Sequence, residues 1–94
     1  MSDWIEIEAD EKHVKREREK ARQFRNSQHW QRLLQKGICH YCGNHFSSHE
    51  LTMDHIVPLS RGGRSVKGNT VPCCKECNNI KKYKTPVEMI LEGL

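Results

Sequence analysis

The stretch Cys39-His-Tyr-Cys42, followed by Asp54-His55 and then by Cys74-Lys-Glu-Cys77, decides how this chain of 94 residues folds. Two Cys-x2-Cys pairs on short turns are the most common way in which a small protein builds a closed tetrahedral zinc site. The Asp-His pair between them cannot join that quartet, because four thiolates already fill the coordination sphere. We therefore expect separate chemistry at Asp54 and His55.

The composition indicates a small domain that needs a metal to fold. Only 35% of the residues are hydrophobic and 30% are charged, so a chain of this length buries little apolar surface. It has no run of about 18 apolar residues that could span a membrane, and its acidic N-terminal stretch is unlike a secretory signal. Five cysteines without an export signal indicate a reducing compartment, where thiols bind metals more often than they form disulfides. The sequence thus predicts a cytoplasmic zinc protein without a membrane partner.

Charge is segregated along the chain, whose net charge is +4. Residues 12–36 carry nine basic and two acidic side chains, a net charge of +7. Residues 57–84 carry seven basic side chains and one acidic one, a net charge of +6. Two basic blocks that flank the Asp-His pair favour a polyanionic partner through counterion release. These charges fit a solvated surface equally well, so the motifs must decide whether the chain binds a nucleic acid.

We expect residues 1–36 to form an N-terminal helical extension and residues 37–94 to form a separate domain. Residues 12–25 contain good helix formers and no glycine or proline. This helix has few apolar residues, so we expect it to project from the body or to pack on a partner. Its apolar positions are Val14, Ala21 and Phe24.

A second helix is expected after the break at Asn26-Ser27, with Ser27 as its N-cap and Gly37 as its terminator. It should bury Trp30, Leu33 and Leu34.

The elements beyond Ile38 are short. Residues 51–56 are expected to form a strand that carries Asp54 and His55, residues 57–69 a loop, Thr70-Val71 a second strand and residues 74–82 a helix. A capping box with proline at the first helical position then opens a last helix at Thr85-Pro86-Val87-Glu88. We expect one face of that helix to belong to the core, namely Val87, Ile90, Leu91 and Leu94.

The expected ligands of a structural zinc ion are Cys39, Cys42, Cys74 and Cys77. Binding free energies on the order of 10–16 kcal/mol are typical of such sites, comparable to the stability of a whole domain. A thioredoxin-like redox pair is disfavoured, because two pairs are present without a βαβ pattern. Cys73 is an alternative to Cys74. The spacing of Cys74 and Cys77 repeats that of the first pair, so we expect Cys73 to be buried as a small hydrophobe instead.

Residues 39–82 resemble the zinc-stapled branch of the HNH (His-Asn-His) endonucleases over about half of the chain. The matching residues are Cys39-x2-Cys42-Gly43, the stretch Met53-Asp-His-Ile-Val-Pro-Leu-Ser-Arg-Gly-Gly63, Asn69, Cys74-x2-Cys77-Asn78 and Lys81. The resemblance implies a small α+β zinc-stapled domain with a ββα-metal, treble-clef-like core. A hairpin would bear the Asp-His pair and a helix the last motif residue. The N-terminal helical extension and a short C-terminal helix would be additions to that core.

The resemblance also implies a metal-dependent DNA endonuclease, a hydrolase that acts on phosphodiester bonds. Histidine has an ordinary pKa of about 6.5, so His55 can take a proton from water at neutral pH. By resemblance His55 activates the water, Asp54 and Asn78 hold one divalent cation, and Asn69 braces the loop and orients His55. Oxygen ligands suit Mg²⁺ or Mn²⁺. The family implies 3′ hydroxyl and 5′ phosphate products.

Two points concern the geometry of these residues. Asp54 and His55 are adjacent, so a regular strand would point them to opposite faces, and the resemblance implies a distorted strand end instead. Asparagine also occurs in the family at the position of Asn78, where the family name has histidine. Asn79 is the rival for this role.

The basic residues on or near the expected site should contact phosphate: Arg61, Arg64, Lys81 and Lys82. The remaining histidines are expected to be solvated or satisfied side chains: His13, His29, His40, His45 and His49. No separate recognition module is evident, so nicking or double-strand cleavage of low sequence specificity is expected. The setting would be a phage packaging, mobile-element or restriction system.

The alternative is a non-catalytic zinc-knuckle module that binds nucleic acid or a protein partner. A module that only binds has no need of Asp54, His55, Asn69 and Asn78 together. The presence of all four therefore disfavours this alternative. An adaptor, or a homodimer formed through the helix at residues 12–25, is a third interpretation.

Overall fold

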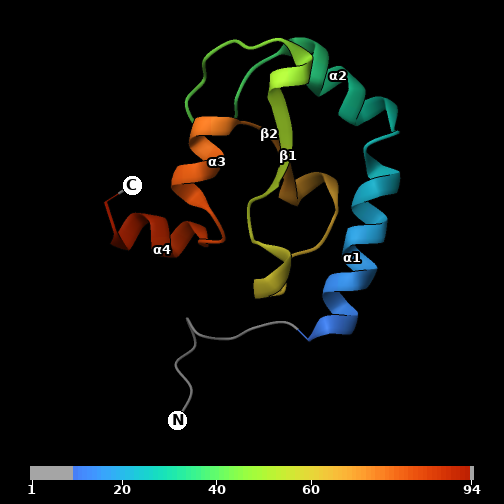
Figure 1. Ribbon diagram of the computed structural model, residues 1–94, viewed down its shortest axis with the longest axis vertical. Coiled ribbons are helices and arrows are strands. Elements are labelled where there is room, and N and C mark those ends of the chain that lie inside the picture. The colour runs from blue at the N-terminus through green and yellow to red at the C-terminus, as the bar shows by residue number, and fades with distance from the viewer. Residues whose placement is uncertain (1–9, 94) are drawn as a thin grey trace.

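The structure, a computed structural model, describes residues 10–93 as a small α+β domain. Its centre is a two-stranded antiparallel sheet in which β1 (Leu51–His55) pairs with β2 (Thr70–Cys74). Figure 1 shows α1 (Glu11–Phe24) and α2 (Gln28–Lys36) along one side of this hairpin. On the other side lie α3 (Lys75–Lys81) and α4 (Pro86–Leu91). The hairpin followed by α3 forms the ββα unit that the sequence predicted.

The register of the hairpin runs from Leu51 opposite Cys74 to His55 opposite Thr70. Pairing therefore continues through His55, and the distortion that the resemblance implied is not seen in β1. The connection between the strands contains two short 3₁₀ turns, Leu59–Arg61 and Lys67–Asn69, and a third turn, Ser48–Glu50, precedes β1.

The boundaries of α2 follow from its capping residues. The Ser27 hydroxyl accepts a hydrogen bond from the Trp30 amide at 3.2 Å, which satisfies a free N–H group of the first turn. Gly37 ends the helix in the left-handed region with φ of 70°, and a Cβ there would lie 2.5 Å from the Phe46 carbonyl oxygen. Both predicted caps are confirmed.

The core is small and is built around the cysteines. Cys39, Leu51 and Cys74 are buried together, and Leu34 and Phe46 pack against them. Trp30 is also buried, at 2% exposure, whereas Leu33 and Leu34 are only partly buried. So little apolar surface contributes limited stability, which makes a metal ion the expected source of the rest.

The apolar side of α4 is exposed, so the prediction that it belongs to the core is wrong. Ile90 is 76% exposed, Leu91 71% and Val87 47%, and Leu94 lies outside the described residues. Polar contacts hold this helix instead: Arg61 donates to Glu88 at 2.8 Å, and Thr85 and Glu88 form the predicted capping box. Amphipathic spacing shows which side of a helix could be buried, but a second element must be present to cover it.

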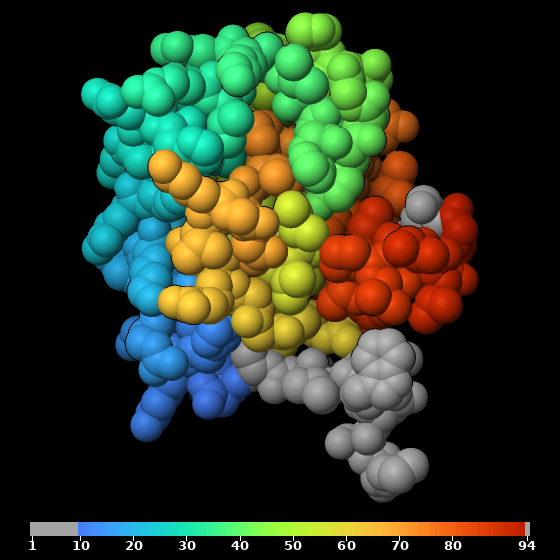
Figure 2. Space-filling model, turned by 180° about the vertical axis from the view of Figure 1, so that it is seen from behind, coloured from blue at the N-terminus to red at the C-terminus, as the bar shows by residue number. Residues whose placement is uncertain are grey.

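The placement of α1 also differs from the expectation, because the helix packs on the body rather than projecting from it. Its buried residues are Glu17 and Ala21. Figure 2 shows the loop between the strands, in yellow to orange, directly against the blue to cyan helix. The contact is largely polar, so the apolar pattern of the helix does not predict it.

No helix among residues 10–93 combines the length and the apolar character required to cross a bilayer.

Candidate active site

A four-cysteine cluster that could hold zinc, called the zinc centre below, forms where the two Cys-x2-Cys turns meet. The sulfur atoms of Cys39, Cys42, Cys74 and Cys77 all lie within 4.8 Å of one another, and those of Cys42 and Cys74 are 4.0 Å apart. A zinc ion with bonds of about 2.3 Å to four tetrahedral thiolates separates the sulfur atoms by about 3.8 Å. The four predicted thiols therefore fit the ion, since their sulfur atoms would have to approach one another by at most about 1 Å.

Local backbone hydrogen bonds hold the two thiols of each pair close together. In the first turn, the Gly43 amide donates to the Cys39 carbonyl oxygen at 2.9 Å, and Gly43 has a φ of 73°. In the second, Cys74 is the N-cap of α3, and its sulfur accepts from the Cys77 amide at 3.5 Å. Each pair is thus held by a turn that its own short sequence can form.

Cys73 lies outside the quartet, as predicted. It is fully buried, and burial raises the pKa of its thiol to about 12. Burial also raises the pKa of Cys39, but backbone hydrogen bonds from Cys42, Cys74 and Tyr41 outweigh it and lower the value to about 6. What separates Cys73 from the four ligand candidates is its position, because its sulfur lies outside their cluster and bonds the Cys74 carbonyl oxygen.

Asp54 is buried and bonds a residue of the first Cys-x2-Cys turn. Its Oδ2 atom accepts a hydrogen bond from the Tyr41 hydroxyl at 2.5 Å and lies 3.4 Å from the Lys81 ammonium group. Burial and the neighbouring carboxylate raise the pKa of Tyr41 above its ordinary value, so this phenol keeps its proton and remains a donor. Sequence analysis missed Tyr41, although its position inside Cys39-x2-Cys42 placed it next to the zinc centre.

His55 is the last residue of β1, and its side chain contacts neighbours different from those of Asp54. The ring nitrogen Nε2 lies 2.9 Å from the hydroxyl oxygen of Ser65, a buried residue of the loop between the strands. Burial lowers the pKa of His55 below its ordinary value, which keeps the imidazole neutral near pH 7. A neutral imidazole has a lone pair with which to accept a proton.

Asn69 braces the loop that follows His55. Its side-chain oxygen accepts from the Val57 amide at 2.8 Å, and its side-chain nitrogen donates to the carbonyl oxygens of Val57 at 3.0 Å and Arg64 at 2.8 Å. The main-chain oxygen of Asn69 also accepts from the Ile56 amide. One residue thus ties the chain after His55 to the start of β2.

Asn78 is exposed on α3, one turn before Lys81. Lys81 contacts β1 directly, because its ammonium group donates to the His55 carbonyl oxygen at 3.0 Å as well as approaching Asp54. Residues three apart lie on the same side of a helix. Asn78 is therefore on the side of α3 that faces the Asp-His pair.

The basic residues predicted to contact phosphate are placed differently from one another. Arg64 and Lys82 are exposed, and Arg61 pairs with Glu88. The Lys81 side chain is only 1% exposed, so the prediction of a phosphate contact for Lys81 is wrong: it is a buried partner of Asp54. The lysine lies on the inner side of a short helix, where its charge meets the carboxylate.

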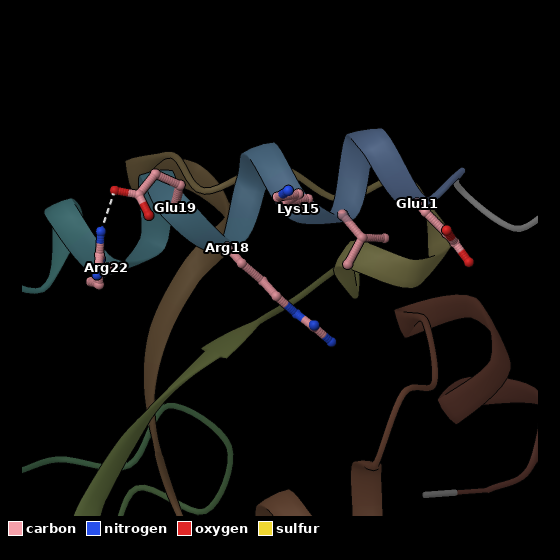
Figure 3. A pocket seen from close by; sticks show the side chains of 6 residues that line it. Glu11, Lys15, Arg18, Glu19 and Arg22 are labelled. Atoms are coloured by element: carbon pink, nitrogen blue, oxygen red, sulfur yellow. Dashed lines mark hydrogen bonds and ion pairs between the residues drawn. The ribbon is translucent and has the colours of Figure 1, made fainter.

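A depression along α1 lies outside this site. Its lining residues all belong to α1, and Figure 3 shows that they are mainly charged: Glu11, Val14, Lys15, Arg18, Glu19 and Arg22. Glu19 and Arg22 form an ion pair of 2.6 Å within it. None of the predicted catalytic residues contributes to this depression.

The family model described as HNH endonuclease matches residues 39–92, more than half of the chain. The chain belongs to the HNH endonuclease family. The match begins at the first zinc ligand and includes the zinc quartet, the Asp-His pair, Asn69, Asn78 and α4. It leaves α1 and α2 outside, so the contact of α1 with the loop joins a helix outside the matched segment to residues within it.

A curated relative matches a longer part of the chain than the family model does. The chain is 30% identical over 71 residues to the type IV methyl-directed restriction enzyme EcoKMcrA of Escherichia coli strain K12. This match covers 69% of the HNH chain but only 26% of that enzyme. The chain thus spans about a quarter of the length of its relative.

Proposed function

We propose that this chain is a metal-dependent DNA endonuclease that hydrolyses phosphodiester bonds with low sequence specificity. Family membership supports a nuclease, and one observation carries the assignment of the site. Lys81 contacts both Asp54 and the His55 backbone, so α3 lies against the end of β1 with Asn78 on the facing side. This contact supports a site to which His55 contributes an imidazole, Asp54 a carboxylate and Asn78 an amide.

In this proposal His55 is the general base. Its imidazole takes a proton from the attacking water, and positioned general bases of this kind contribute about 10²–10⁴ in rate. The lowered pKa of His55 supports the role, because the unprotonated form predominates at neutral pH. Asn69 holds the loop beyond His55 and limits its movement.

Asp54 and Asn78 are the proposed ligands of one divalent cation. Among the described residues, the Tyr41 hydroxyl and the Lys81 ammonium group both approach Oδ2 of Asp54. Oδ1 is left for a cation. Asn78 is exposed and offers an amide oxygen. Such oxygen ligands suit Mg²⁺ or Mn²⁺, and a bound ion would stabilise the charge that develops on the phosphate and the leaving 3′ oxygen.

DNA would approach the basic surface around the site. Arg64 on the loop and Lys82 at the end of α3 are exposed and are the proposed phosphate contacts. Lys81 is not among them, because it is buried. The relative from Escherichia coli is a restriction enzyme, and a restriction or phage setting for this chain stays a prediction.

The test is cleavage of supercoiled plasmid by the zinc-loaded protein with added Mg²⁺ or Mn²⁺. We expect nicked product with metal, and none with EDTA at a concentration that leaves the zinc content unchanged. His55→Ala should lose cleavage by a factor of about 10²–10⁴ while keeping zinc and its circular dichroism spectrum. His49→Ala is the matched control, because His49 is exposed on a 3₁₀ turn outside the site.

Two results would contradict the proposal. Supercoiled plasmid that persists in every metal would leave the non-catalytic binding module as the function. Normal cleavage by His55→Ala would remove His55 from the mechanism and point to another base.

A further inference from the structure

Helix α1 contacts the loop that follows His55 through two polar residues one helical turn apart, His13 and Glu17, called the polar stripe below. His13 donates from Nε2 to the Gly63 carbonyl oxygen at 2.8 Å. Glu17 receives two hydrogen bonds from Ser65, one from the amide to its side-chain oxygen Oε1 and one from the hydroxyl to its main-chain oxygen, each of 2.7 Å. Positions four apart share one side of a helix, so α1 presents this stripe to the loop as a unit.

The contact is well buried and specific. Glu17 is 3% exposed and Ser65 6% exposed. Gly63 has to be glycine, since a Cβ there would collide with the Val57 carbonyl group, and this tight approach brings the Gly63 oxygen to His13. Among the described residues, Glu17 also forms an ion pair with Lys20 at 3.2 Å. The hydrogen bond from the Ser65 amide lowers the pKa of Glu17, which keeps the carboxylate ionised and a strong acceptor.

The hydrogen bonds of Ser65 determine which nitrogen of His55 carries the proton. A serine hydroxyl has one hydrogen, and a main-chain carbonyl oxygen can only accept. The Ser65 hydrogen is therefore given to the Glu17 carbonyl oxygen, and the Ser65 oxygen must accept from His55 Nε2 at 2.9 Å. The neutral imidazole thus carries its proton on Nε2 and has its lone pair on Nδ1.

We propose that Ser65 and Glu17 are positioning residues for His55: together they hold the tautomer and the ring orientation that leave Nδ1 free to act as a base. Helix α1, which lies outside the segment that defines the family, is then a part of the catalytic unit. The inference rests on the proposed role of His55, but the tautomer can be measured whether or not the protein cleaves DNA.

The first test is Ser65→Ala in the full zinc-loaded chain. The alanine keeps the amide hydrogen bond to Glu17 and removes the acceptor of His55 Nε2, so the loop stays attached while the ring loses its partner. Two-bond ¹H–¹⁵N correlation spectra distinguish the tautomers when recorded near pH 8, above the ordinary histidine pKa of about 6.5. The His55 signals are identified by their loss in His55→Ala. We expect the wild type to show the Nε2–H form, and Ser65→Ala to show the Nδ1–H form in addition.

The nicking assay provides the second measurement. In Ser65→Ala we expect kcat to fall by about 10- to 100-fold with little change in KM, because the base is misplaced while the DNA surface is intact. Glu17→Ala should move the tautomer and kcat in the same direction. Glu17→Gln keeps an Oε1 acceptor for the Ser65 amide, and it should restore the Nε2–H form and a kcat within about twofold of wild type. Glu19→Ala, an exposed acid two residues along, is the matched control and should change neither quantity.

The outcomes separate this inference from the proposed function. A single Nε2–H form together with a wild-type kcat in Ser65→Ala would overturn the positioning role, even if His55→Ala is inactive. A wild-type protein that cleaves nothing would overturn the nuclease, while the tautomer measurement would still decide what Ser65 does. If Glu17→Ala loses its zinc or its cooperative melt, Ser65→Ala and Glu17→Gln still decide the question, because both keep the bond between the helix and the loop.

Discussion

The ammonium group of Lys81 lies 3.4 Å from Oδ2 of Asp54, and the two side chains are 1% and 8% exposed. A buried charge without its partner is costly, because it has lost the solvation of water. Since Lys81 also donates to the His55 carbonyl oxygen, it joins α3 to both residues of the Asp-His pair. The orientation of the site therefore depends on a residue that does not reach the solvent.

Lys81→Ala should destabilise the protein by about 3–5 kcal/mol, the usual cost of leaving one partner of a buried ion pair alone. Chemical denaturation of the zinc-loaded protein measures this change. Lys75→Ala, at the exposed start of the same helix, should stay within about 0.5 kcal/mol of wild type. Equal effects of the two substitutions would show that the Lys81–Asp54 pair contributes nothing specific.

Substitution by serine should have opposite effects on zinc binding at Cys39, a ligand of the quartet, and at Cys73, which lies outside it. Cys39→Ser removes a zinc ligand, so we expect loss of the bound zinc and of the cooperative melt, because metal binding supplies folding free energy. Cys73→Ser should keep one zinc per chain, since this residue lies outside the quartet and its sulfur bonds the Cys74 carbonyl oxygen. Elemental analysis beside circular dichroism distinguishes the cases, and loss of zinc in Cys73→Ser would reassign the fourth ligand.

The exposed side of α4 should tolerate polar residues. Ile90→Ser changes a side chain that is 76% exposed, and we expect a stability within about 0.5 kcal/mol of wild type. Leu51→Ala removes a buried core side chain of β1 and should cost about 2–5 kcal/mol. Thermal melts of both variants provide the measurement. A large loss in Ile90→Ser would mean that α4 buries this side in solution.

The outer side of α1 is proposed to bind DNA while its inner side holds Ser65. Lys15 and Arg18 are exposed on the side drawn in Figure 3. The double variant Lys15→Ala, Arg18→Ala should bind DNA more weakly, and its salt dependence should be shallower by about 1.8 log units per log unit of salt if both contact phosphate. Its His55 tautomer and kcat should not change. An unchanged salt slope would make this side of the helix a solvated surface.

Much of the site could be predicted from the sequence because it depends on local spacing. A Cys-x2-Cys pair needs only a tight turn to bring its sulfur atoms together, and Ser27, Gly37 and Thr85 act on the backbone of their own helices. The Asp-His pair and Asn69 were recognisable because their types and spacing match a family pattern. The assignment of Cys73 to the core followed from the same regular spacing and is confirmed by its burial.

What only the tertiary structure decided is which side of each helix finds a partner. The basic stretch around Lys81 predicted an exposed side chain that contacts phosphate. The packing of α3 on β1 instead buries that lysine against Asp54. The apolar spacing of α4 predicted a core, yet no described element covers it. The few apolar residues of α1 predicted a helix that projects from the body or packs on a partner, yet its polar residues His13 and Glu17 bond a loop about 50 residues away. Periodicity describes the surface that a helix presents, whereas burial depends on the groups that the rest of the chain brings to that surface.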